Sequence, residues 1–384
     1  MDELKQYREE IDRIDRQMAD LFRQRMAVVD KVGQYKLQRG IPVLDAARER
    51  EVLAAKAELV ADAADRADLT AMFENLMAIS RRRQRKLIHE GGGTPGYDRC
   101  KRALAAVREP VWSPRVVYQG VAGAYSEMAC VNFFADTSEN IGVEQFEEAF
   151  LAIKEGRADY AVLPIENSTS GAIRQVYDLM NEYECYIVGE TTVKVEHCLM
   201  APKGASLDTI THVYSHEQAL FQSDRFLNAR PGWVRVPCAD TAGAAQFVAQ
   251  TGDVTKAAIG SERAAELYGL DILFRGTNHN TNNTTRFVVV SPVMELRAGA
   301  DKISTVFSLP HEAGSLHRIM SIFAVNGLNM TKLESRPMPG HSWEYMFFLE
   351  FAGSLNAPEM DGILHELAQT TAEFRVLGNF VANL

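Results

Sequence analysis

The stretch LKQYREEIDRIDRQMADLFRQRMAVVDKVGQYKLQR, residues 4–39, places apolar side chains at alternating steps of three and four. This spacing predicts one long amphipathic helix, because residues three and four apart share a face of an α-helix. Arg25 interrupts the apolar stripe. A guanidinium in a buried stripe is unfavourable unless an anion meets it, and that anion is either an acidic residue of the protein or a bound ligand.

Two shorter helices are expected within the first 90 residues. Gly40 and Pro42 end the first helix, Asp45 is suited to cap a second helix at 46–60, and a third is expected at 68–88. A compact monomer of three such unequal helices would leave much of the long stripe uncovered. The sequence therefore predicts an all-α unit that dimerises through its first helix.

The basic residues of the first helix restrict where a ligand can bind. Arg25 and Lys36 lie about 16 Å apart along the axis and about 20° apart around it, so both can approach one small anion. Arg8 lies about 25 Å from Arg25 by the same rise per residue and cannot reach that anion within its own chain.

Composition excludes several classes of protein. The 384 residues suggest two or three domains, and the formal net charge of -10 argues against nucleic acid or an anionic membrane as partner. The 5 cysteines show no metal-ligand spacing and are interpreted as reduced thiols. Neither a secretory signal nor an apolar run long enough to span a bilayer is present, so a cytoplasmic location is expected.

The segment 114–293, after a glycine-rich linker at 91–113, changes to short apolar runs separated by helical stretches. This alternation predicts a two-lobed α/β unit, whose sites lie beyond the ends of the strands. Polar clusters are expected to follow the strands at 120–126, 164–168, 215–218, 240–242 and 284–287. Taken singly, each cluster also fits a tight turn or a helix cap.

The last segment, 302–384, has the pattern strand, helix, strand, strand, helix, strand. This order is that of an α+β ferredoxin-like unit, and by itself it does not give a function.

The first 90 residues resemble the all-helical chorismate mutases. The resemblance is carried by Arg8-Glu-x-Ile-Asp-x-Ile-Asp, Arg25, Gly33-x-x-Lys36, Asp45-x-x-Arg48-Glu49 and Ser80-x-x-x-Gln84. The implied substrate, chorismate, is a dicarboxylate and would supply the anion that Arg25 lacks. Its rearrangement to prephenate is unimolecular and implies no cofactor and no metal; catalysis means holding the reactive conformer and stabilising charge on the breaking ether oxygen.

The resemblance also implies a role for each polar residue. Arg25 and Arg8 of the partner subunit would bind carboxylates, while Lys36 and Gln84 would bind the ether oxygen. This sharing requires antiparallel first helices that cross near Ala19. Glu49 would bind the substrate hydroxyl. Arg48 and Asp45 would line and orient the pocket, and Ser80 would lie at its edge. Outside this set, the arginines at 81–83 are interpreted as solvated charge near a helix end.

The segment 114–293 resembles prephenate dehydratase. Its motifs are Gly-Ala-Tyr-Ser at 123–126, Pro-Ile-Glu-Asn-Ser at 164–168 and Thr-Arg-Phe at 285–287. The implied reaction expels carbon dioxide and a hydroxyl from prephenate and gives phenylpyruvate. Thr285 would donate a hydrogen bond to the leaving hydroxyl. The resemblance also implies that Glu166 supports the substrate site and that Arg286 either meets a carboxylate or braces the loop. The residues implied to orient the substrate are Asn167, Ser215, Gln218 and Thr241. The family often has proline at the position of Glu217 and serine at that of Asp240.

The segment 302–384 resembles the ACT domain of prephenate dehydratases, which implies inhibition by phenylalanine. The residues that carry this resemblance are Gly314, Ser315, Leu316, Asn329, Glu334, Ser335 and Arg336. A dimerisation domain without a ligand is the alternative.

Together the three resemblances predict a bifunctional enzyme of phenylalanine biosynthesis, forming a homodimer or a higher homo-oligomer. Two alternatives stay open at this point. Arogenate could replace prephenate as the dehydratase substrate, or the chain could be a regulatory protein with one inactive catalytic unit.

Overall fold

The computed structural model describes residues 2–41, 43, 45–88, 94–312, 314–338 and 344–383. Pro42, the glycines at 91–93 and the turn expected at Pro339-Gly340 lie outside these residues. Contacts divide the chain into two units, Met1–Lys101 with Phe307–Arg375, and Arg102–Val306 with Val376–Leu384. No helix of the described residues is both long enough and apolar enough to cross a bilayer.

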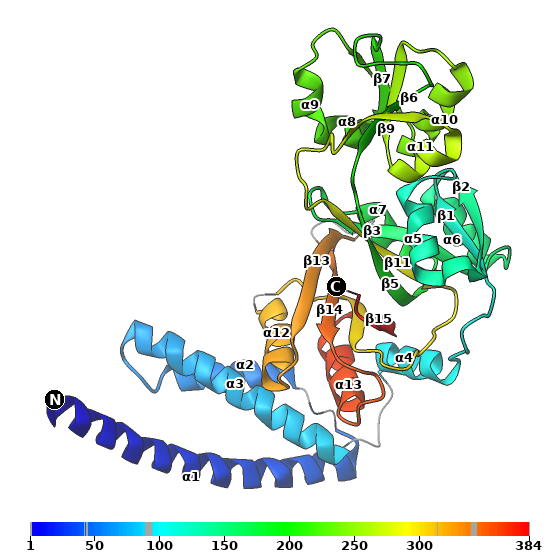
Figure 1. Cartoon of the computed structure of the whole chain (residues 1–384). Helices are drawn as coiled ribbons and strands as arrows, with labels where there is room; N and C mark the ends of the chain where they lie inside the picture. The colour runs from blue at the N-terminus through cyan, green and yellow to red at the C-terminus, as the bar shows by residue number, and fades with distance from the viewer. Residues whose placement is uncertain are drawn as a thin grey trace. The chain divides into compact units, whose positions relative to one another are not determined.

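The three predicted N-terminal helices are confirmed as α1 (Asp2–Arg39), α2 (Ala46–Ala57) and α3 (Ala63–Ile88) (Figure 1). Asp45 caps α2 by accepting the backbone N–H of Arg48 at 3.0 Å. The third helix begins five residues before the predicted start, at 63 instead of 68. The cause is Asp62, whose carboxylate accepts the N–H groups of Ala64 and Asp65 and so caps an earlier turn.

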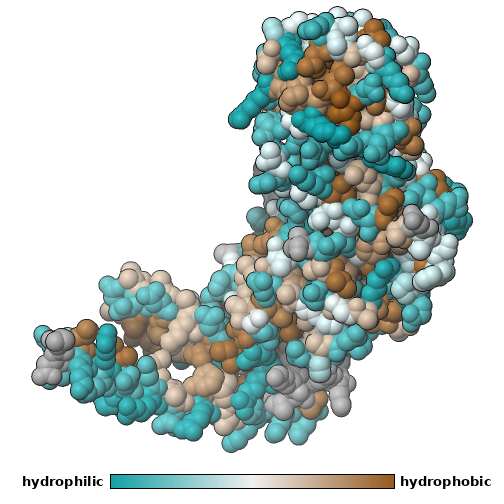
Figure 2. Space-filling model, in the orientation of Figure 1, coloured by the Kyte–Doolittle hydropathy of each residue, from teal (hydrophilic) through white to brown (hydrophobic). Residues whose placement is uncertain are grey.

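The apolar stripe of α1 is exposed along most of the helix. Met26 and Val29 are buried, whereas the stripe residues on both sides of them stay exposed, from 41% for Val32 to 63% for Leu21. Figure 2 shows apolar side chains in this helical region beside a hydrophilic outer edge. The single chain therefore leaves most of the stripe without a partner.

The predicted two-lobed α/β arrangement is confirmed. The first lobe holds a sheet of order β2-β1-β3-β11-β5, with β4 paired to β3, and the second holds a sheet of order β10-β6-β9-β7-β8. The first lobe comprises β1 (Arg115–Gln119), α5 (Tyr125–Phe134), η1 (Ala135–Thr137), β2 (Glu139–Val143), α6 (Phe146–Lys154), β3 (Tyr160–Asn167), β4 (Gly171–Ala172), α7 (Arg174–Glu182), β5 (Tyr186–Lys194) and β11 (Thr284–Ser291), and α4 (Pro95–Ala105) precedes it. The second lobe comprises β6 (Cys198–Ala201), β7 (His212–His216), α8 (Glu217–Gln222), α9 (Asp224–Asn228), β8 (Val234–Cys238), α10 (Thr241–Thr251), β9 (Lys256–Gly260), α11 (Glu262–Tyr268) and β10 (Asp271–Arg275).

The chain crosses between the lobes twice, at 195–197 and at 276–283, and the crossing segments pair where Val195 N–H donates to Asn283 O at 2.8 Å. Further contacts hold the lobes together. The Ser261 hydroxyl donates to Gly123 O and the Tyr268 hydroxyl to Ala122 O, both at 2.7 Å. The lobes are thus connected by the two crossing segments and by side-chain hydrogen bonds.

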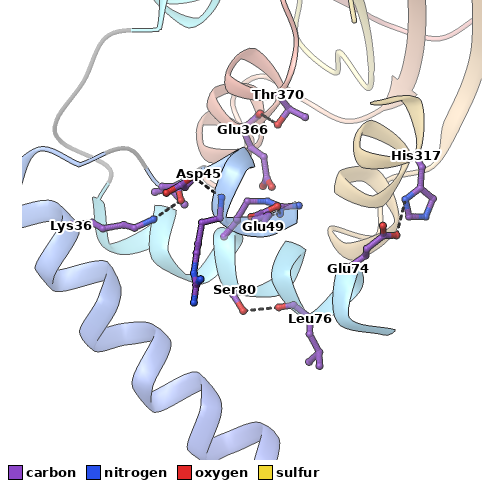
Figure 3. Close-up of polar contacts among 12 residues, drawn as sticks. Lys36, Asp45, Glu49, Glu74, Leu76, Ser80, His317, Glu366 and Thr370 are labelled. Atoms are coloured by element: carbon purple, nitrogen blue, oxygen red, sulfur yellow. Dashed lines mark hydrogen bonds and ion pairs between the residues drawn. The ribbon is translucent and has the colours of Figure 1, made fainter. Parts of the chain in front are cut away.

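The C-terminal segment forms a four-stranded sheet of order β13-β14-β12-β15, which confirms the predicted strand and helix pattern. Its elements are β12 (Lys302–Ser308), α12 (Ser315–Val325), β13 (Met330–Pro337), β14 (Tyr345–Ala352), α13 (Met360–Thr370) and β15 (Glu373–Phe380). Helix α12 contacts α3, where Arg82 Nη1 donates to Val325 O at 2.7 Å and His317 lies 3.8 Å from Glu74 (Figure 3).

Candidate active sites

A cavity of about 190 Å³ lies among α1, α2 and α3. It is lined by Arg25, Val29, Lys36, Val43, Asp45, Arg48, Glu49, Val52, Met77, Ser80, Arg81 and Gln84. These include seven of the eight residues that the resemblance assigns to the mutase. The exception, Arg8, does not line the cavity of its own chain, as the rise per residue of α1 requires.

Arg25 meets no acid within the described part of the chain. Its Nη1 donates to the Ser80 hydroxyl at 2.6 Å and to Leu76 O at 3.4 Å. Ser80 in turn donates to Leu76 O (Figure 3). Burial lowers the pKa of the guanidinium. The described residues therefore provide no internal ion pair for Arg25, and its charge is available to a bound anion.

Lys36 and Gln84 offer further polar groups to the cavity. Lys36 Nζ donates to Val43 O at 2.6 Å, and burial lowers its pKa against the opposing attraction of the Asp45 and Glu49 carboxylates. Gln84 Oε1 is buried and has no hydrogen-bond partner among the described residues. Because a flip of the amide exchanges oxygen and nitrogen, Gln84 can offer either an acceptor or a donor to a ligand.

Arg81 is a cavity residue that the sequence interpretation missed. It was expected to be solvated, but it is buried, and its Nη1 donates to both carboxylate oxygens of Glu49 at 2.7 and 2.6 Å. Only Arg83 of the run is exposed, in an ion pair with Asp30. Helical spacing was a usable signal, because Met77, Ser80, Arg81 and Gln84 follow the i, i+3, i+4, i+7 pattern of one face.

Thr285 and Asn167 meet across two adjacent strands of the first lobe. They are register partners of β11 and β3, and Asn167 Nδ2 donates to Thr285 Oγ1 at 2.9 Å. The prediction that Thr285 follows a strand is wrong, since Thr284 begins β11. The two residues still meet, because β11 runs antiparallel to β3 and starts where β3 ends.

A buried chain of hydrogen bonds extends from this pair into the second lobe. Asn167 Nδ2 also donates to Asn283 Oδ1 at 2.8 Å, Asn283 Nδ2 donates to Gln222 Oε1 at 3.0 Å, and His197 Nε2 lies 3.1 Å from the same oxygen. Burial lowers the pKa of His197 to about 4. The sequence interpretation missed Asn283, Gln222 and His197, and only the position of Gln222, four residues after Gln218 on α8, was a usable signal.

The other residues assigned to the second lobe lie at the ends of strands and the starts of helices. Ser215 is buried at the end of β7 and donates to Ile259 O at 2.6 Å. Thr241 begins α10 directly after the capping Asp240. Gln218 is half-buried on α8, and it is Gln222, four residues later, that accepts the hydrogen bond from Asn283.

Glu166 and Arg286 form a separate cluster on the face of the sheet opposite Thr285. They are register partners next to the Asn167–Thr285 pair, and alternation along a strand places them on the opposite face of the sheet. Arg286 Nη1 pairs with the buried Glu190 at 2.9 Å, its Nε lies 3.6 Å from Glu166, and Lys302 Nζ reaches Glu190 at 2.5 Å. These contacts favour the bracing role of Arg286 over a contact with a substrate carboxylate, and the supporting role of Glu166 stays a prediction.

Replacing Glu190 with glutamine should destabilise the α/β unit, because Arg286 and Lys302 lose the anion that both contact in a buried place. We expect the free energy of unfolding to fall by about 2 kcal/mol, the range of a hydrogen bond to a charged group. Urea unfolding followed by circular dichroism measures it. The control is Glu196→Gln, whose exposed pair with Lys194 should change stability by less than about 0.5 kcal/mol. Equal effects of the two variants would contradict the prediction.

The residues of the predicted phenylalanine site lie on two elements. Gly314 precedes α12 with a φ of 81°, and Ser315, buried at the start of that helix, accepts from Arg318 Nη2 at 3.0 Å. Leu316 is partly exposed on the first turn of the same helix. The others lie just before or on the edge strand β13: Asn329, Glu334, Ser335 and Arg336.

Residues 7–85 match the family model of chorismate mutase type II, and residues 116–295 match that of prephenate dehydratase. The bifunctional chorismate mutase/prephenate dehydratase of Escherichia coli K12 is 34% identical over 377 residues, which cover 97% of this chain and 94% of that protein. The chain belongs to the bifunctional chorismate mutase/prephenate dehydratase family.

Two further relatives each match about two thirds of the chain. An arogenate dehydratase/prephenate dehydratase of Arabidopsis thaliana is 37% identical over 277 residues, covering 69% of this chain and 72% of that protein. The prephenate dehydratase of Arthrobacter aurescens in complex with L-Phe aligns with a TM-score of 0.64 at 28% identity, covering 70% of this chain and 90% of that one. In this family, the α1–α3 cavity and the Thr285–Asn167 pair are therefore two separate candidate active sites.

Proposed function

We propose that this chain rearranges chorismate to prephenate in the α1–α3 cavity and then converts prephenate to phenylpyruvate in the α/β unit. The observation that carries the proposal is that one cavity gathers seven residues assigned to the mutase, while Arg25 within it has no acidic partner among the described residues. We assign 1–90 to the mutase, 91–113 to a linker, 114–293 to the dehydratase and 302–384 to regulation.

The mutase step needs only binding and charge. Arg25 binds one carboxylate of the substrate, and Lys36 and Gln84 hydrogen-bond the ether oxygen as negative charge develops on it. Two observations support these roles: Lys36 is half-buried at the cavity, and an amide flip would place Gln84 Nε2, a donor, at the buried position that has no partner among the described residues. Donors already fixed before the reaction stabilise the transition state without reorganisation, and binding in the cavity holds the reactive conformer.

A second copy of the chain completes the mutase site. The N-terminal stripe of α1 is exposed in the single chain, and an antiparallel partner helix would cover it. Crossing near Ala19 brings Arg8 of the partner subunit to the cavity between Arg25 and Lys36. The site is then shared between two protomers of a homodimer.

In the dehydratase step, the network around Thr285 makes it a hydrogen-bond donor to the substrate. Asn167 Oδ1 accepts the backbone N–H groups of Thr169 and Ser170, both at 3.0 Å, so its Nδ2 must face Thr285 and donate to Oγ1. The hydroxyl hydrogen of Thr285 has no acceptor among the described residues. It is therefore available to the leaving hydroxyl of prephenate, while aromatisation drives the loss of carbon dioxide.

Replacing Asn167 with aspartate tests this orientation. The new carboxylate oxygen would accept the Thr285 hydroxyl hydrogen and divert it from the substrate. We expect dehydratase kcat to fall on the order of 100-fold, as when one transition-state donor is lost, with mutase kcat unchanged. Stopped assays with prephenate and with chorismate measure the two activities. Undiminished dehydratase turnover would contradict the assigned donor direction.

We propose that phenylalanine binds the C-terminal ferredoxin-like unit, as an ACT domain, and inhibits the dehydratase. The L-Phe complex of the Arthrobacter aurescens dehydratase supports the presence of such a ligand in a similar protein. Incubating purified protein with chorismate, and following prephenate and phenylpyruvate with and without phenylalanine, tests the whole proposal. Absence of both products would contradict the enzyme assignment, and turnover unchanged by phenylalanine would leave the last domain a dimerisation unit.

Arogenate is the second candidate for the dehydratase substrate, because the Arabidopsis thaliana relative carries both substrates in its name. Comparing kcat/KM for prephenate and arogenate on the same preparation decides between them.

A further inference from the structure

Arg81 occupies a place in the mutase cavity for which the proposed roles do not account. Its side chain is 10% exposed on α3, and that of Glu49 is 22% exposed on α2. A buried ion pair of this kind contributes little stability relative to apolar packing of the same volume. Stability therefore does not explain why the cavity wall carries a charged pair. The pair can instead act on the other charged groups of the wall.

The cavity wall contains more cationic than anionic side chains. Its charged members are Arg25, Lys36, Arg48, Arg81, Asp45 and Glu49. Within one chain, four positive and two negative charges leave a net charge of +2, the sign that a dicarboxylate ligand requires. The balance is useful only if the cations that must meet the substrate are not paired with the carboxylates of the wall.

Lys36 is the cation most at risk of such pairing. The carboxylates of Asp45 and Glu49 both act on its ammonium group across the cavity. Arg48 already pairs with Glu51 at 2.9 Å, so its cation is directed to an acid other than Glu49. A Glu49 released from α3 would therefore turn toward Lys36, since opposite charges in a partly buried wall attract strongly.

We propose that Arg81 is a positioning residue of the mutase: it holds the Glu49 carboxylate against α3, and this keeps the Lys36 ammonium group available to the ether oxygen. Arg81 Nη1 contacts both oxygens of Glu49 from one side, at 2.7 and 2.6 Å. The lone pairs on the other side of the carboxylate remain free to accept the substrate hydroxyl. This inference rests on the proposed mutase activity and adds a residue outside the motifs that indicate it.

Three variants separate positioning from packing. In Arg81→Met the side chain keeps its bulk and loses its donors, and in Arg81→Lys one donor and the charge remain. The control is Arg83→Met, whose exposed pair with Asp30 lies outside the cavity lining. We expect mutase kcat/KM to fall on the order of 30-fold in Arg81→Met, mainly in kcat, to recover to within about fivefold in Arg81→Lys, and to stay unchanged in Arg83→Met.

The alkaline limb of the mutase pH profile gives a readout that a merely structural role would not move. The charged groups that face Lys36 are Arg25 on α1, Asp45, Glu49 and Arg48 at and within α2, and Arg81 on α3. In Arg81→Met the freed Glu49 carboxylate favours the charged ammonium group, so the pKa of Lys36 rises and the limb moves to higher pH. An unmoved limb, or equal activity of the methionine and lysine variants, would overturn the inference.

A double variant keeps the inference testable if Arg81→Met alone fails to fold. Glu49→Gln/Arg81→Met removes both charges of the pair. In the Glu49→Gln background the Arg81 substitution should change kcat by less than about twofold, because its partner is absent. A further loss equal to that in the native background would show that Arg81 acts through another group. If the native chain forms no prephenate from chorismate, the proposed function fails; an active native chain with an unaffected Arg81→Met variant refutes only the role of Arg81.

Discussion

Replacing Thr285 with alanine should reduce dehydratase turnover on the order of 1,000-fold, because it removes the hydroxyl donor to the leaving group of prephenate. Asn167 keeps its own hydrogen bonds to Thr169 and Ser170, so the loss comes from the missing donor and not from a collapsed loop. The mutase cavity lies on α1–α3 and shares no residue with this strand. Prephenate formation from chorismate should therefore continue at the native rate.

Thr285→Ser is the matched control, since serine retains the hydroxyl and its acceptor position for Asn167. We expect it to keep dehydratase kcat within about tenfold of the native value, the difference arising from the freer side chain. Phenylpyruvate absorbance in base and prephenate consumption measure the two variants. An alanine variant that still turns over prephenate would remove Thr285 from the mechanism, and loss of both activities would mean that the two sites are not independent.

The sequence was sufficient where the pattern is local. The three N-terminal helices follow from periodicity and caps, and the order of the C-terminal strands follows from alternation and turns. The start of α3 was missed because the capping effect of Asp62 lies outside the periodic stretch. The separation of Arg8 from Arg25 followed from helix geometry alone.

The sequence was insufficient where a site depends on strand register or on contacts between distant segments. The adjacency of Thr285 and Asn167 comes from the antiparallel register of β11 and β3, which are separated by the whole second lobe. The same register reveals that Arg286 faces away from Thr285. His197 gave no signal, because a single histidine before an apolar strand is usually structural.

Replacing Arg25 with alanine should lower mutase kcat/KM on the order of 1,000-fold, since a half-buried guanidinium that binds a carboxylate makes strong charge-assisted hydrogen bonds. Ser80 and Leu76 O, its present partners, cannot substitute for the charge. Arg8→Ala should have a comparable effect, although Arg8 does not line the cavity of its own chain. Both variants should keep dehydratase activity. Initial rates with chorismate measure the mutase loss.

Mixing the two inactive variants tests whether each site draws on both chains. In a heterodimer, the chain with Arg8→Ala keeps its own Arg25 and receives an intact Arg8 from its partner, whereas the other site lacks both arginines. Random exchange in an equimolar mixture makes about half of the dimers mixed, so about a quarter of all sites are complete. Mutase activity should rise to about a quarter of the native value. Exchange demonstrated by mass-tagged chains without any recovery would place Arg8 outside the site, and the exposed stripe of α1 would then need another partner.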